Sequence, residues 1–296
     1  MTQLQPRLGP RDLIVAAVMN LMWGLNIIAV KMAVTEVQPF TAAFLRQAIV
    51  LAVCIGWLRI VPGKMRALLG LGLLTGGLFF LVINLSLVVA TNVSALAIAG
   101  QLGVPFSMLL AVLVLKERIR VYRIVGVALS LLGVGILVFD PAVQHELAGI
   151  ALTALSSAIW AFSSLIQRSL KGVPVLTIYG WIGLVGTLVL APAALVFEPQ
   201  GFAALPHIPL KSFGWVAFSA IGSTLIGHGS MSWLLQRHPV ASVTPLTLAS
   251  PVLSVAFASW FFATPLTWIM ILGGVIALTG VAIITIRSAR AGESRA

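Results

Sequence analysis

The chain has 296 residues, of which 60% are apolar and only 8% are Asp, Glu, Lys or Arg. Soluble domains average about 25% charged residues, because a surface that faces water requires them. A water-soluble fold is therefore excluded for most of the chain, and lipid must be its solvent. Because a transmembrane helix needs roughly 20 apolar residues to cross a hydrocarbon core of about 30 Å, the length allows about ten such helices.

The formal net charge of +11 comes from 18 Lys and Arg residues against 7 Asp and Glu residues. Nucleic-acid-binding proteins gather such charge on one face among aromatic side chains. Here the basic residues stand in small groups between long apolar runs, which is typical of membrane topology signals. We therefore expect no nucleic-acid partner.

In chain order, hydropathy and the positions of Gly, Pro and charged residues predict ten membrane spans. They cover residues 12–34, 40–60, 66–89, 93–115, 121–139, 147–168, 174–197, 211–235, 240–262 and 266–286. The apolar runs are continuous, unlike the alternating segments of about ten residues in a membrane β-barrel. The predicted fold class is an all-α integral membrane protein. No small-residue cleavage site follows the first run, so we expect a retained helix rather than a signal peptide.

Lys and Arg residues indicate the orientation of these spans, because cytoplasmic segments carry an excess of them. With a cytoplasmic N-terminus, fifteen of the 18 basic residues fall on the cytoplasmic side, while Lys31 and Lys211 fall at outer ends and Arg46 lies within a span. The fifteen are Arg7, Arg11, Arg59, Lys64, Arg66, Lys116, Arg118, Arg120, Arg123, Arg168, Lys171, Arg237, Arg287, Arg290 and Arg295. Ten spans then place both termini in the cytoplasm.

The two halves of the chain repeat each other. Trp23 and Lys31 match Trp160 and Arg168, which lie 137 residues later (160 − 23 and 168 − 31). Further matches, 146 or 147 residues apart, pair Gly76 with Gly222, Ala95 with Ala241, Pro105 with Pro251, Gly126 with Gly273 and Gly133 with Gly280. We expect one five-helix repeat over residues 12–139, a second over residues 147–286 and a short basic cytoplasmic tail over residues 287–296.

Each repeat holds five spans, an odd number, so the second repeat must enter the membrane from the side opposite to the first. Inverted repeats let two similar halves exchange conformations and open a central site to one side and then to the other. The sequence thus predicts two inverted five-helix repeats around a central cavity, the architecture of alternating access.

Paired prolines are the first indication of where a transported substrate binds. Proline removes a backbone donor, and paired interruptions in the two halves point to a transport site. Pro105 lies one turn after Gln101, and Pro251 shares a helical face with Thr244 and Ser254. These residues either contact substrate or only kink and pack their helices, and the two interpretations are compatible.

The first helix of each half provides a second indication. Asn20 and Trp23 share one face of the first span, and Trp160 and Ser163 lie on a polar face of the sixth. A polar face is costly in lipid, so these faces should point into the bundle. Both tryptophans lie near mid-span, away from the interfaces where Trp is usual. They are predicted to line the cavity, with core packing as the alternative.

Two ionisable residues lie well inside spans. Arg46 stands about two helical turns into the second span, where it could attract a substrate carboxylate or extend to the outer interface. His228 lies mid-span in the eighth helix and could titrate, hydrogen-bond a substrate or be a core residue. No Asp or Glu lies in the central part of a predicted span, which disfavours a carboxylate-driven pump.

The sequence contains no P-loop, no His/Cys metal cluster and no nucleophile paired with a base. We therefore expect no enzymatic activity, no cofactor and no metal ion. The single cysteine, Cys54, lies in an apolar run and is expected to be a passive buried thiol.

Several stretches of the sequence resemble the EamA-type drug/metabolite transporter superfamily. They are Trp23-Gly24-Leu25-Asn26 followed by Lys31, Phe44-Leu45-Arg46, and Pro105 through Leu115-Lys116-Glu117-Arg118 with glycines at 126 and 133. The resemblance covers nearly the whole chain and implies ten helices in two inverted repeats, a central cavity and export of small metabolites across the bacterial inner membrane. Within the superfamily the chain is similar to amino-acid exporters, including those for aromatic amino acids. The family often repeats the acid of Glu117 at the end of the ninth span, but Ala263 stands there, so we expect no role that needs both acids.

The predicted function is export of amino acids with hydrophobic or aromatic side chains by alternating access. Ser, Thr, Asn and Gln side chains suit the polar end of such a substrate, and Trp faces suit its apolar body. One alternative is a broad exporter of drugs or lipophilic cations, and another is a membrane sensor or scaffold without flux. The expected partners are a small-molecule substrate and membrane lipid, with the oligomeric state left open.

Overall fold

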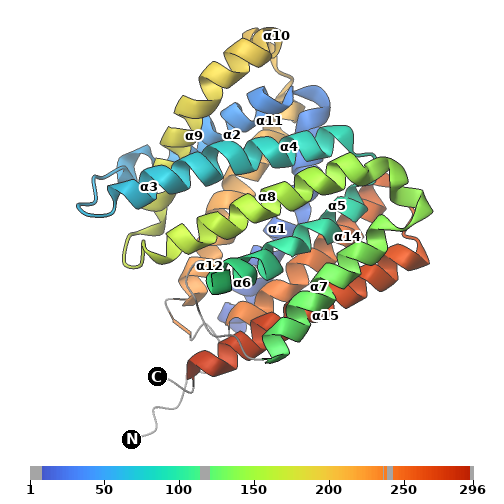
Figure 1. Cartoon of the computed structure of the whole chain (residues 1–296). Helices are drawn as coiled ribbons and strands as arrows, with labels where there is room; N and C mark the ends of the chain where they lie inside the picture. The colour runs from blue at the N-terminus through green and yellow to red at the C-terminus, as the bar shows by residue number, and fades with distance from the viewer. Residues whose placement is uncertain (1–8, 114–120, 236, 239–242, 294–296) are drawn as a thin grey trace, which may run out of the picture.

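The computed structural model describes residues 9–113, 121–235, 237–238 and 243–293. Within these ranges the chain is helical and contains no strand. Long helices build a single bundle, in which α4 and α8 lie side by side and α7 pairs with α15 (Figure 1). The predicted all-α class is therefore confirmed for the described part of the chain.

The first half consists of long rods, two of which change helical type midway. Its helices are α1 (Pro10–Glu36), α2 (Pro39–Cys54, continued by a 3-10 turn at Ile55–Trp57), α3 (Met65–Leu71), α4 (Phe80–Val89), α5 (Val93–Ala99), α6 (Gly103–Leu113) and α7 (Val121–Val138). A π-helical segment, Gly72–Phe79, joins α3 to α4. A 3-10 turn, Gly100–Leu102, joins α5 to α6.

The second half repeats this pattern. Its helices are α8 (Leu147–Arg168, preceded by 3-10 turns at Pro141–Glu146), α9 (Val175–Phe197), α10 (Pro199–Ala203, followed by a 3-10 turn at Leu205–His207), α11 (Leu210–Ala217), α12 (His228–Leu235), α14 (Ala249–Phe262) and α15 (Trp268–Glu293). A π-helical segment, Phe218–Gly227, joins α11 to α12. A 3-10 segment, Thr244–Leu248, leads into α14.

Proline and glycine set several helix boundaries. Pro10, Pro39 and Pro199 occupy the first positions of α1, α2 and α10, where the missing N–H costs no intrahelical bond. Gly63 and Gly172 have φ values of 75° and 88° in the turns before α3 and α9. Only glycine adopts that conformation without strain, so these two residues allow the chain to reverse between helices.

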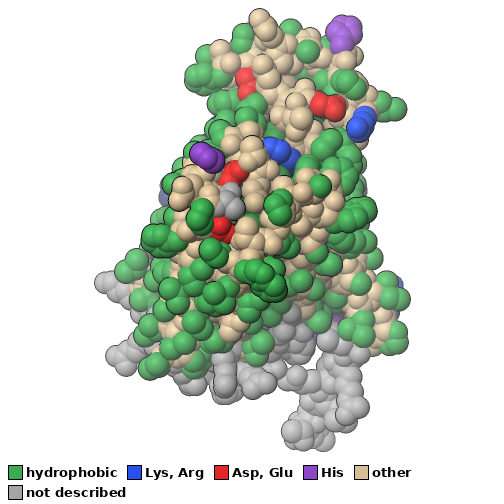
Figure 2. Space-filling view, turned by 90° about the vertical axis from the view of Figure 1, so that its right-hand side faces the viewer, with side chains coloured by type: hydrophobic (Ala, Val, Ile, Leu, Met, Phe, Trp, Pro, Cys, Tyr) green, Lys and Arg blue, Asp and Glu red, His purple; other side chains and the backbone are tan. Residues whose placement is uncertain are grey.

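Seven helical segments of the described chain are long and apolar enough to cross a membrane. They are Pro10–Glu36, Pro39–Trp57, Met65–Val89, Val93–Leu110, Val143–Gln167, Val175–Phe197 and Trp268–Ile286. The other three predicted spans correspond to the shorter apolar helices Ile124–Val138 and Leu246–Phe262 and to the rod formed by α11, the π-helical segment and α12. Figure 2 shows a face covered mostly by apolar side chains, with the few charged ones in its upper half. The chain is thus a multi-pass membrane protein, and the number of ten crossings stays a prediction.

Helices α7 and α15 pack through the repeated glycines. A Cβ atom added to Gly273 would lie 2.6 Å from the Gly133 carbonyl oxygen, and one added to Gly126 would lie 2.9 Å from the Gly280 carbonyl oxygen. Ser130 Oγ donates a hydrogen bond to the Ala277 carbonyl across the same interface at 3.4 Å. Such small residues let helix backbones approach closely, which drives helix association in membranes.

Two buried carboxylates cap helix N-termini across the boundary between the halves. Glu198, at the end of α9, accepts hydrogen bonds from the backbone N–H of Phe40 at 3.0 Å and of Thr41 at 2.8 Å, at the start of α2. Glu146 accepts the backbone N–H of Asn92 at 2.9 Å, at the start of α5. A carboxylate at a helix N-terminus satisfies free donors and complements the helix dipole. Glu198 and Glu146 thereby each hold the start of a helix of the first half.

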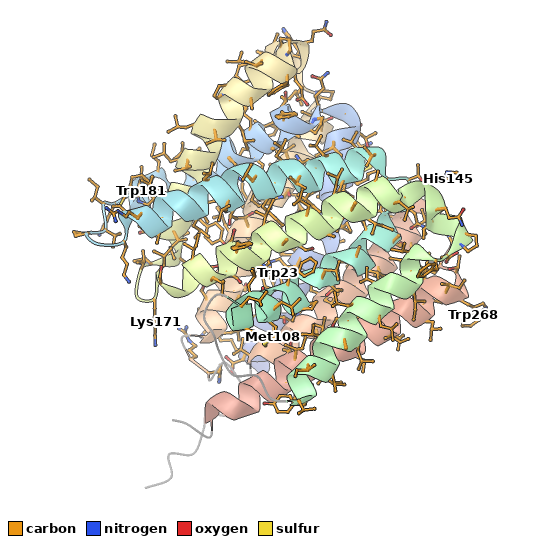
Figure 3. The ribbon with its side chains drawn as sticks, in the orientation of Figure 1. Trp23, Met108, His145, Lys171, Trp181 and Trp268 are labelled. Carbon is orange, nitrogen blue, oxygen red and sulfur yellow. The ribbon has the colours of Figure 1, made fainter. Side chains whose placement is uncertain are left out.

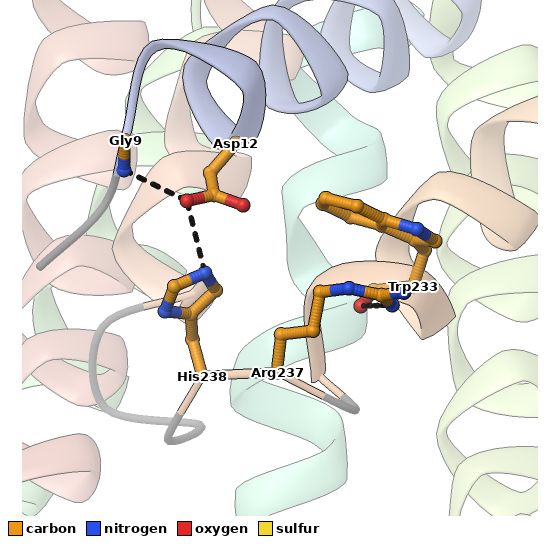
Figure 4. Close-up of polar contacts among 5 residues, drawn as sticks. All are labelled: Gly9, Asp12, Trp233, Arg237 and His238. Carbon is orange, nitrogen blue, oxygen red and sulfur yellow. Dashed lines mark hydrogen bonds and ion pairs between the residues drawn. The ribbon is translucent and has the colours of Figure 1, made fainter. Parts of the chain in front are cut away.

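A further polar contact joins α1 to the segment after α12 (Figure 4). His238 Nε2 lies 3.1 Å from Asp12 Oδ2, and the same carboxylate oxygen accepts the Gly9 backbone N–H at 2.7 Å. The Arg237 guanidinium lies over the Trp233 ring, 4.0 Å from its centroid. The Asp12–His238 contact links the beginning of the first half to the second half at the end where α1 starts.

Candidate functional site

A cavity of about 380 Å³ lies inside the bundle and is lined by both halves of the chain. Figure 3 shows Trp23, one of its lining residues, in the middle of the bundle, with Lys171 and Trp181 toward one end and His145 and Trp268 toward the other. Besides aromatic and aliphatic side chains, the wall contains the hydroxyl groups of Thr153, Ser156, Ser157, Ser223, Ser250 and Ser254. The cavity therefore offers both apolar surface and neutral hydrogen-bonding groups.

Irregular helical segments border this cavity at matching positions of the two repeats. The π-helical segments begin at Gly72 and Phe218, which are 146 residues apart (218 − 72), the spacing that also separates Gly76 from Gly222. The first ends at Phe79 and the second leads directly to His228, and both residues line the cavity. π-helical turns are rare and are frequent at functional sites. Their paired occurrence indicates that both repeats contribute the same type of element to the wall.

An aromatic cluster surrounds the imidazole of His228. The ring centroid of His228 lies 5.1 Å from that of Trp23, 6.0 Å from that of Trp160 and 5.4 Å from that of Tyr179. Phe79 extends the cluster, with its ring 5.4 Å from Trp160. These separations are in the range of favourable aromatic packing. The two tryptophans that match in the repeat thus meet at one residue of α12.

Gly227 makes room for this cluster. A Cβ atom at Gly227 would lie 2.5 Å from Trp23 Nε1 and 2.8 Å from Trp23 Cδ1, which is closer than non-bonded contact allows. The glycine before His228 therefore lets the Trp23 indole pass against the backbone of the second half.

Arg46 places a buried cation at the cavity wall. Its side chain is 5% exposed and points into the bundle, where its guanidinium lies 3.9 Å from the centroid of the Phe80 ring. Nη1 donates to Ser219 Oγ, and Nη2 donates to Thr224 Oγ1 at 2.8 Å. Ser219 in turn donates to Asn26 Oδ1 at 2.7 Å. The partners of Arg46 are thus hydroxyl groups and an aromatic face, and the charge has no acidic partner among the described residues.

Three polar atoms of the lining are buried and have no hydrogen-bond partner within the described chain: Trp23 Nε1, Arg46 Nε and Thr153 Oγ1. Buried polar groups are satisfied in the great majority of cases, because an unmade hydrogen bond costs about 1–3 kcal/mol. Two of these atoms are N–H donors. Trp23 Nε1 lies against the backbone at Gly227, and Arg46 Nε belongs to the buried guanidinium.

Five of the residues that the sequence singles out lie around the cavity. They are Trp23, Arg46, Gln101, Trp160 and His228. Gln101 Nε2 donates to the Ala97 carbonyl at 3.2 Å, so this hydrogen bond does not use its amide oxygen. Substrate contact at these five residues stays a prediction.

Four others, Asn20, Pro105, Ser163 and Pro251, are not among the residues that line the cavity. Asn20 is buried and donates to the carbonyls of Ala16 and Leu246, at 2.7 and 3.0 Å, so it ties α1 to the segment before α14. Ser163 donates to the Ile159 carbonyl of its own helix at 2.9 Å.

Pro105 and Pro251 both follow 3-10 segments, Gly100–Leu102 and Thr244–Leu248. Their position agrees with the helix-shaping interpretation. The side chain of Thr244 lies outside the described part of the structure, as does the whole of Glu117.

Other residues at the wall or in contact with wall residues were not among the predicted ligands. Phe79 and Phe80 lie at the π-to-α transition, and Asn26 and Ser219 complete the hydrogen-bond chain from Arg46. Tyr179 reaches His228 from α9. A signal existed for Asn26, which stands one turn from Trp23 on the polar face of the first span. No sequence pattern indicates the remaining contacts, because they join helices far apart in the chain.

No group of three His, Cys, Asp or Glu side chains that could hold a metal ion occurs in the described ranges. Cys54 is buried and unpaired with another cysteine. The chemical groups that the described cavity wall presents are hydrogen-bonding groups, aromatic rings and the guanidinium of Arg46.

Comparison with known proteins adds relatives of similar length. The chain is 24% identical over 284 residues to a protein of Escherichia coli (strain K12) named "Probable amino-acid metabolite efflux pump", covering 91% of this chain and 93% of that protein. It is 26% identical over 283 residues to a protein of the same name from Salmonella typhimurium, with the same two coverages. An "Uncharacterized transporter" of Archaeoglobus fulgidus is 27% identical over 276 residues, covering 92% of this chain and 97% of that protein.

A solved structure titled only "Crystal structure of protein" shares the fold, with a TM-score of 0.62 at 22% identity over 96% of this chain and 99% of that one. The model of the EamA-like transporter family matches residues 11–139 and again residues 147–286. These two matches confirm the resemblance inferred from the motifs. The chain therefore belongs to the EamA-like transporter family.

Proposed function

We propose that this transporter exports small metabolites across the bacterial inner membrane, and that its substrates are amino acids with hydrophobic or aromatic side chains. The observation that carries the proposal is the composition of the cavity wall, in which a buried cation lies beside a cluster of aromatic rings. The names of the bacterial relatives support amino acids or their metabolites as the cargo.

Arg46 is the candidate anchor for the substrate carboxylate. Its Nε–H is buried and has no partner among the described residues, and its hydrogen bonds to Ser219 and Thr224 use two of the five N–H groups of a guanidinium. Bonds between a guanidinium and a carboxylate are charge-assisted and about twice as strong as neutral ones. A carboxylate that enters the cavity would therefore gain more at Arg46 than at any hydroxyl of the wall.

The aromatic cluster is the candidate surface for the substrate side chain. Trp23, Trp160 and Phe79 line the cavity with large apolar rings, of which the two tryptophans pack against His228 and Phe79 packs against Trp160. Aromatic pairs contribute about 0.5–1.5 kcal/mol beyond the burial of their area. The cavity volume of about 380 Å³ is at the small end of the range for ligand pockets, roughly 300–1,000 Å³, and so favours a compact solute.

The repeat supports transport by alternating access, and the lack of a P-loop in the sequence supports transport without ATP hydrolysis. We propose ten spans in two inverted five-helix repeats, over residues 12–139 and 147–286, with both termini and the tail over residues 287–296 in the cytoplasm. The paired π-helical segments support this, because broken or irregular helices at equivalent positions form the binding sites of inverted-repeat transporters.

Counterflow of radiolabelled phenylalanine and leucine into proteoliposomes preloaded with the unlabelled amino acid tests this function. The purified full-length protein should give saturable accumulation that empty liposomes do not give. If neither these nor a panel of the other amino acids accumulates above the empty-liposome level, the proposed function is wrong.

The aromatic cluster also favours a second candidate, a lipophilic cation, because ring faces attract cations. Arg46 opposes it, since a like charge at the same wall repels the cation. Tetraphenylphosphonium should therefore fail to inhibit phenylalanine counterflow, and strong inhibition would favour the drug exporter instead.

A further inference from the structure

We propose that the cavity recognises the carboxylate and the aromatic body of its substrate but not the α-ammonium group, so that aromatic monocarboxylates without an amino group, such as 3-phenyllactate, bind it more tightly than the matching amino acids. This inference rests on the proposed function of the same site. Its basis is the distribution of charge over the cavity wall.

Among the described residues, Arg46 is the one charged side chain of the wall, and no Asp, Glu or Lys residue lines the cavity. The described acids lie elsewhere. Glu146 and Glu198 cap the starts of α5 and α2, Asp12 pairs with His238, Glu36 accepts a hydrogen bond from Ser212, and Asp140 accepts one from Thr267. No described carboxylate is therefore placed to neutralise Arg46 or to receive a substrate cation.

A buried cation of this kind is costly inside a membrane protein. Ser219, Thr224 and the face of Phe80 stabilise it through dipoles and a ring quadrupole, which is less than a full opposite charge provides. A bound monoanion brings the net charge of the occupied cavity to zero. A zwitterion brings a second cation with its carboxylate and leaves the occupied cavity at +1.

The hydrogen-bond acceptors that the described cavity wall presents to an ammonium group are neutral. Asn26 Oδ1 already accepts the Ser219 hydroxyl, and Ser156 and Ser157 donate to the carbonyls of Thr153 and Gly100. Their oxygen atoms, the Gln101 amide oxygen and the aromatic faces can accept an N–H, but none carries a negative charge. The ammonium thus loses its hydration without an ionic partner, whereas a hydroxyl group at the same carbon loses less and uses the same neutral partners.

Because the ammonium has only neutral partners in the cavity, 3-phenyllactate should bind about tenfold more tightly than phenylalanine, a difference of about 1.4 kcal/mol. The opposite truncation, which keeps the ammonium and removes the carboxylate, should abolish binding. Phenylethylamine and phenylalanine methyl ester are compounds of that kind.

The experiment is competition against labelled phenylalanine counterflow at pH 7.5, where 3-phenyllactate is ionised, with 3-phenyllactate, unlabelled phenylalanine, phenylethylamine and phenylalanine methyl ester as competitors. We expect half-maximal inhibition by 3-phenyllactate at a concentration about tenfold below that of phenylalanine, and no inhibition by the other two. The thermal midpoint of the detergent-purified protein, measured with each compound, gives a readout that does not depend on flux, because a ligand raises apparent stability by mass action.

The test variant is Arg46→Gln, in which the cavity wall loses the charge of Arg46, and the control variant is Arg59→Gln. In thermal-shift titrations the preference for 3-phenyllactate over phenylalanine should disappear in Arg46→Gln, whereas in Arg59→Gln, which removes an exposed arginine, it should persist.

Transport of phenylalanine with weaker or absent binding of 3-phenyllactate would overturn the inference and leave the proposed function intact. Binding of 3-phenyllactate with no transport of any amino acid would support the inference and overturn amino acids as the cargo. Absence of both would overturn the two proposals together.

Discussion

Trp23 of the first repeat lies against His228 of the second, with ring centroids 5.1 Å apart and planes inclined by 58°. The contact joins the two halves at the cavity wall and depends on the absence of a side chain at Gly227. Because alternating access requires the halves to rearrange around a shared site, residues at such a contact should influence transport more than the folding of either half.

The variant Gly227→Ala tests this contact. Its Cβ would lie 2.5 Å from Trp23 Nε1, so the indole must leave its position beside His228. We expect phenylalanine counterflow to fall by tenfold or more, about 1.4 kcal/mol, while the protein still elutes as a single species. Gly229→Ala is the matched control, because a Cβ there meets nothing within 4 Å. Equal activity of the two variants would contradict a role for the Trp23 position.

Removal of the second tryptophan tests the aromatic surface. Trp160→Ala takes away a ring that contacts both Phe79 and His228. We expect the half-saturation concentration for phenylalanine to rise about tenfold and that for leucine to rise less, because ring-to-ring contacts add to apolar burial. The control is Trp268→Ala, at a residue that is 84% exposed. An equal loss for both substrates would indicate general packing instead.

Stability of the bundle should depend on the glycine contacts between α7 and α15. Gly273→Ala places a Cβ 2.6 Å from the Gly133 carbonyl oxygen and must push the two helices apart. Overpacking of this kind costs about 1–3 kcal/mol, so the thermal midpoint in detergent should drop by several degrees. Gly135→Ala, on α7 with open space around its Cβ, should leave the midpoint unchanged or raise it slightly. A drop of the same size in both variants would argue against the interface.

The carboxylate of Glu198 should stabilise the start of α2. Glu198→Ala leaves the N–H groups of Phe40 and Thr41 without their acceptor, and loss of a helix cap costs about 0.5–2 kcal/mol. We expect a lower thermal midpoint with little change in substrate affinity. Gln200→Ala, at an exposed position in the same short helix α10, is the comparison. An unaltered midpoint in Glu198→Ala would show that the cap contributes nothing measurable.

Much of the fold could be predicted because apolar runs and punctuating Gly and Pro residues are local signals. The predicted ranges 66–89 and 174–197 differ by one residue from the observed Met65–Val89 and Val175–Phe197. The repeated glycines 126, 133, 273 and 280 were recognisable as matches, and they prove to pack against each other across the α7–α15 interface.

The site was less predictable, because it depends on contacts between distant helices. The direction of Arg46 is set by Ser219 and Thr224, which are 173 and 178 residues away in sequence. Asn20 carries a polar side chain on the expected face, but this side chain donates a hydrogen bond to the Leu246 carbonyl. The π-helical segments have no distinctive sequence pattern, since their geometry depends on how neighbouring helices pack. Hydrophobic periodicity is insensitive to all three.

The most direct measurement of the central claim compares labelled phenylalanine counterflow by the parent protein, Arg46→Gln and Arg59→Gln in parallel proteoliposomes. A carboxylate anchored by Arg46 predicts saturable counterflow in the parent and in Arg59→Gln, and a loss of at least tenfold in Arg46→Gln with normal yield and a monodisperse elution profile. Undiminished counterflow in Arg46→Gln would contradict the account.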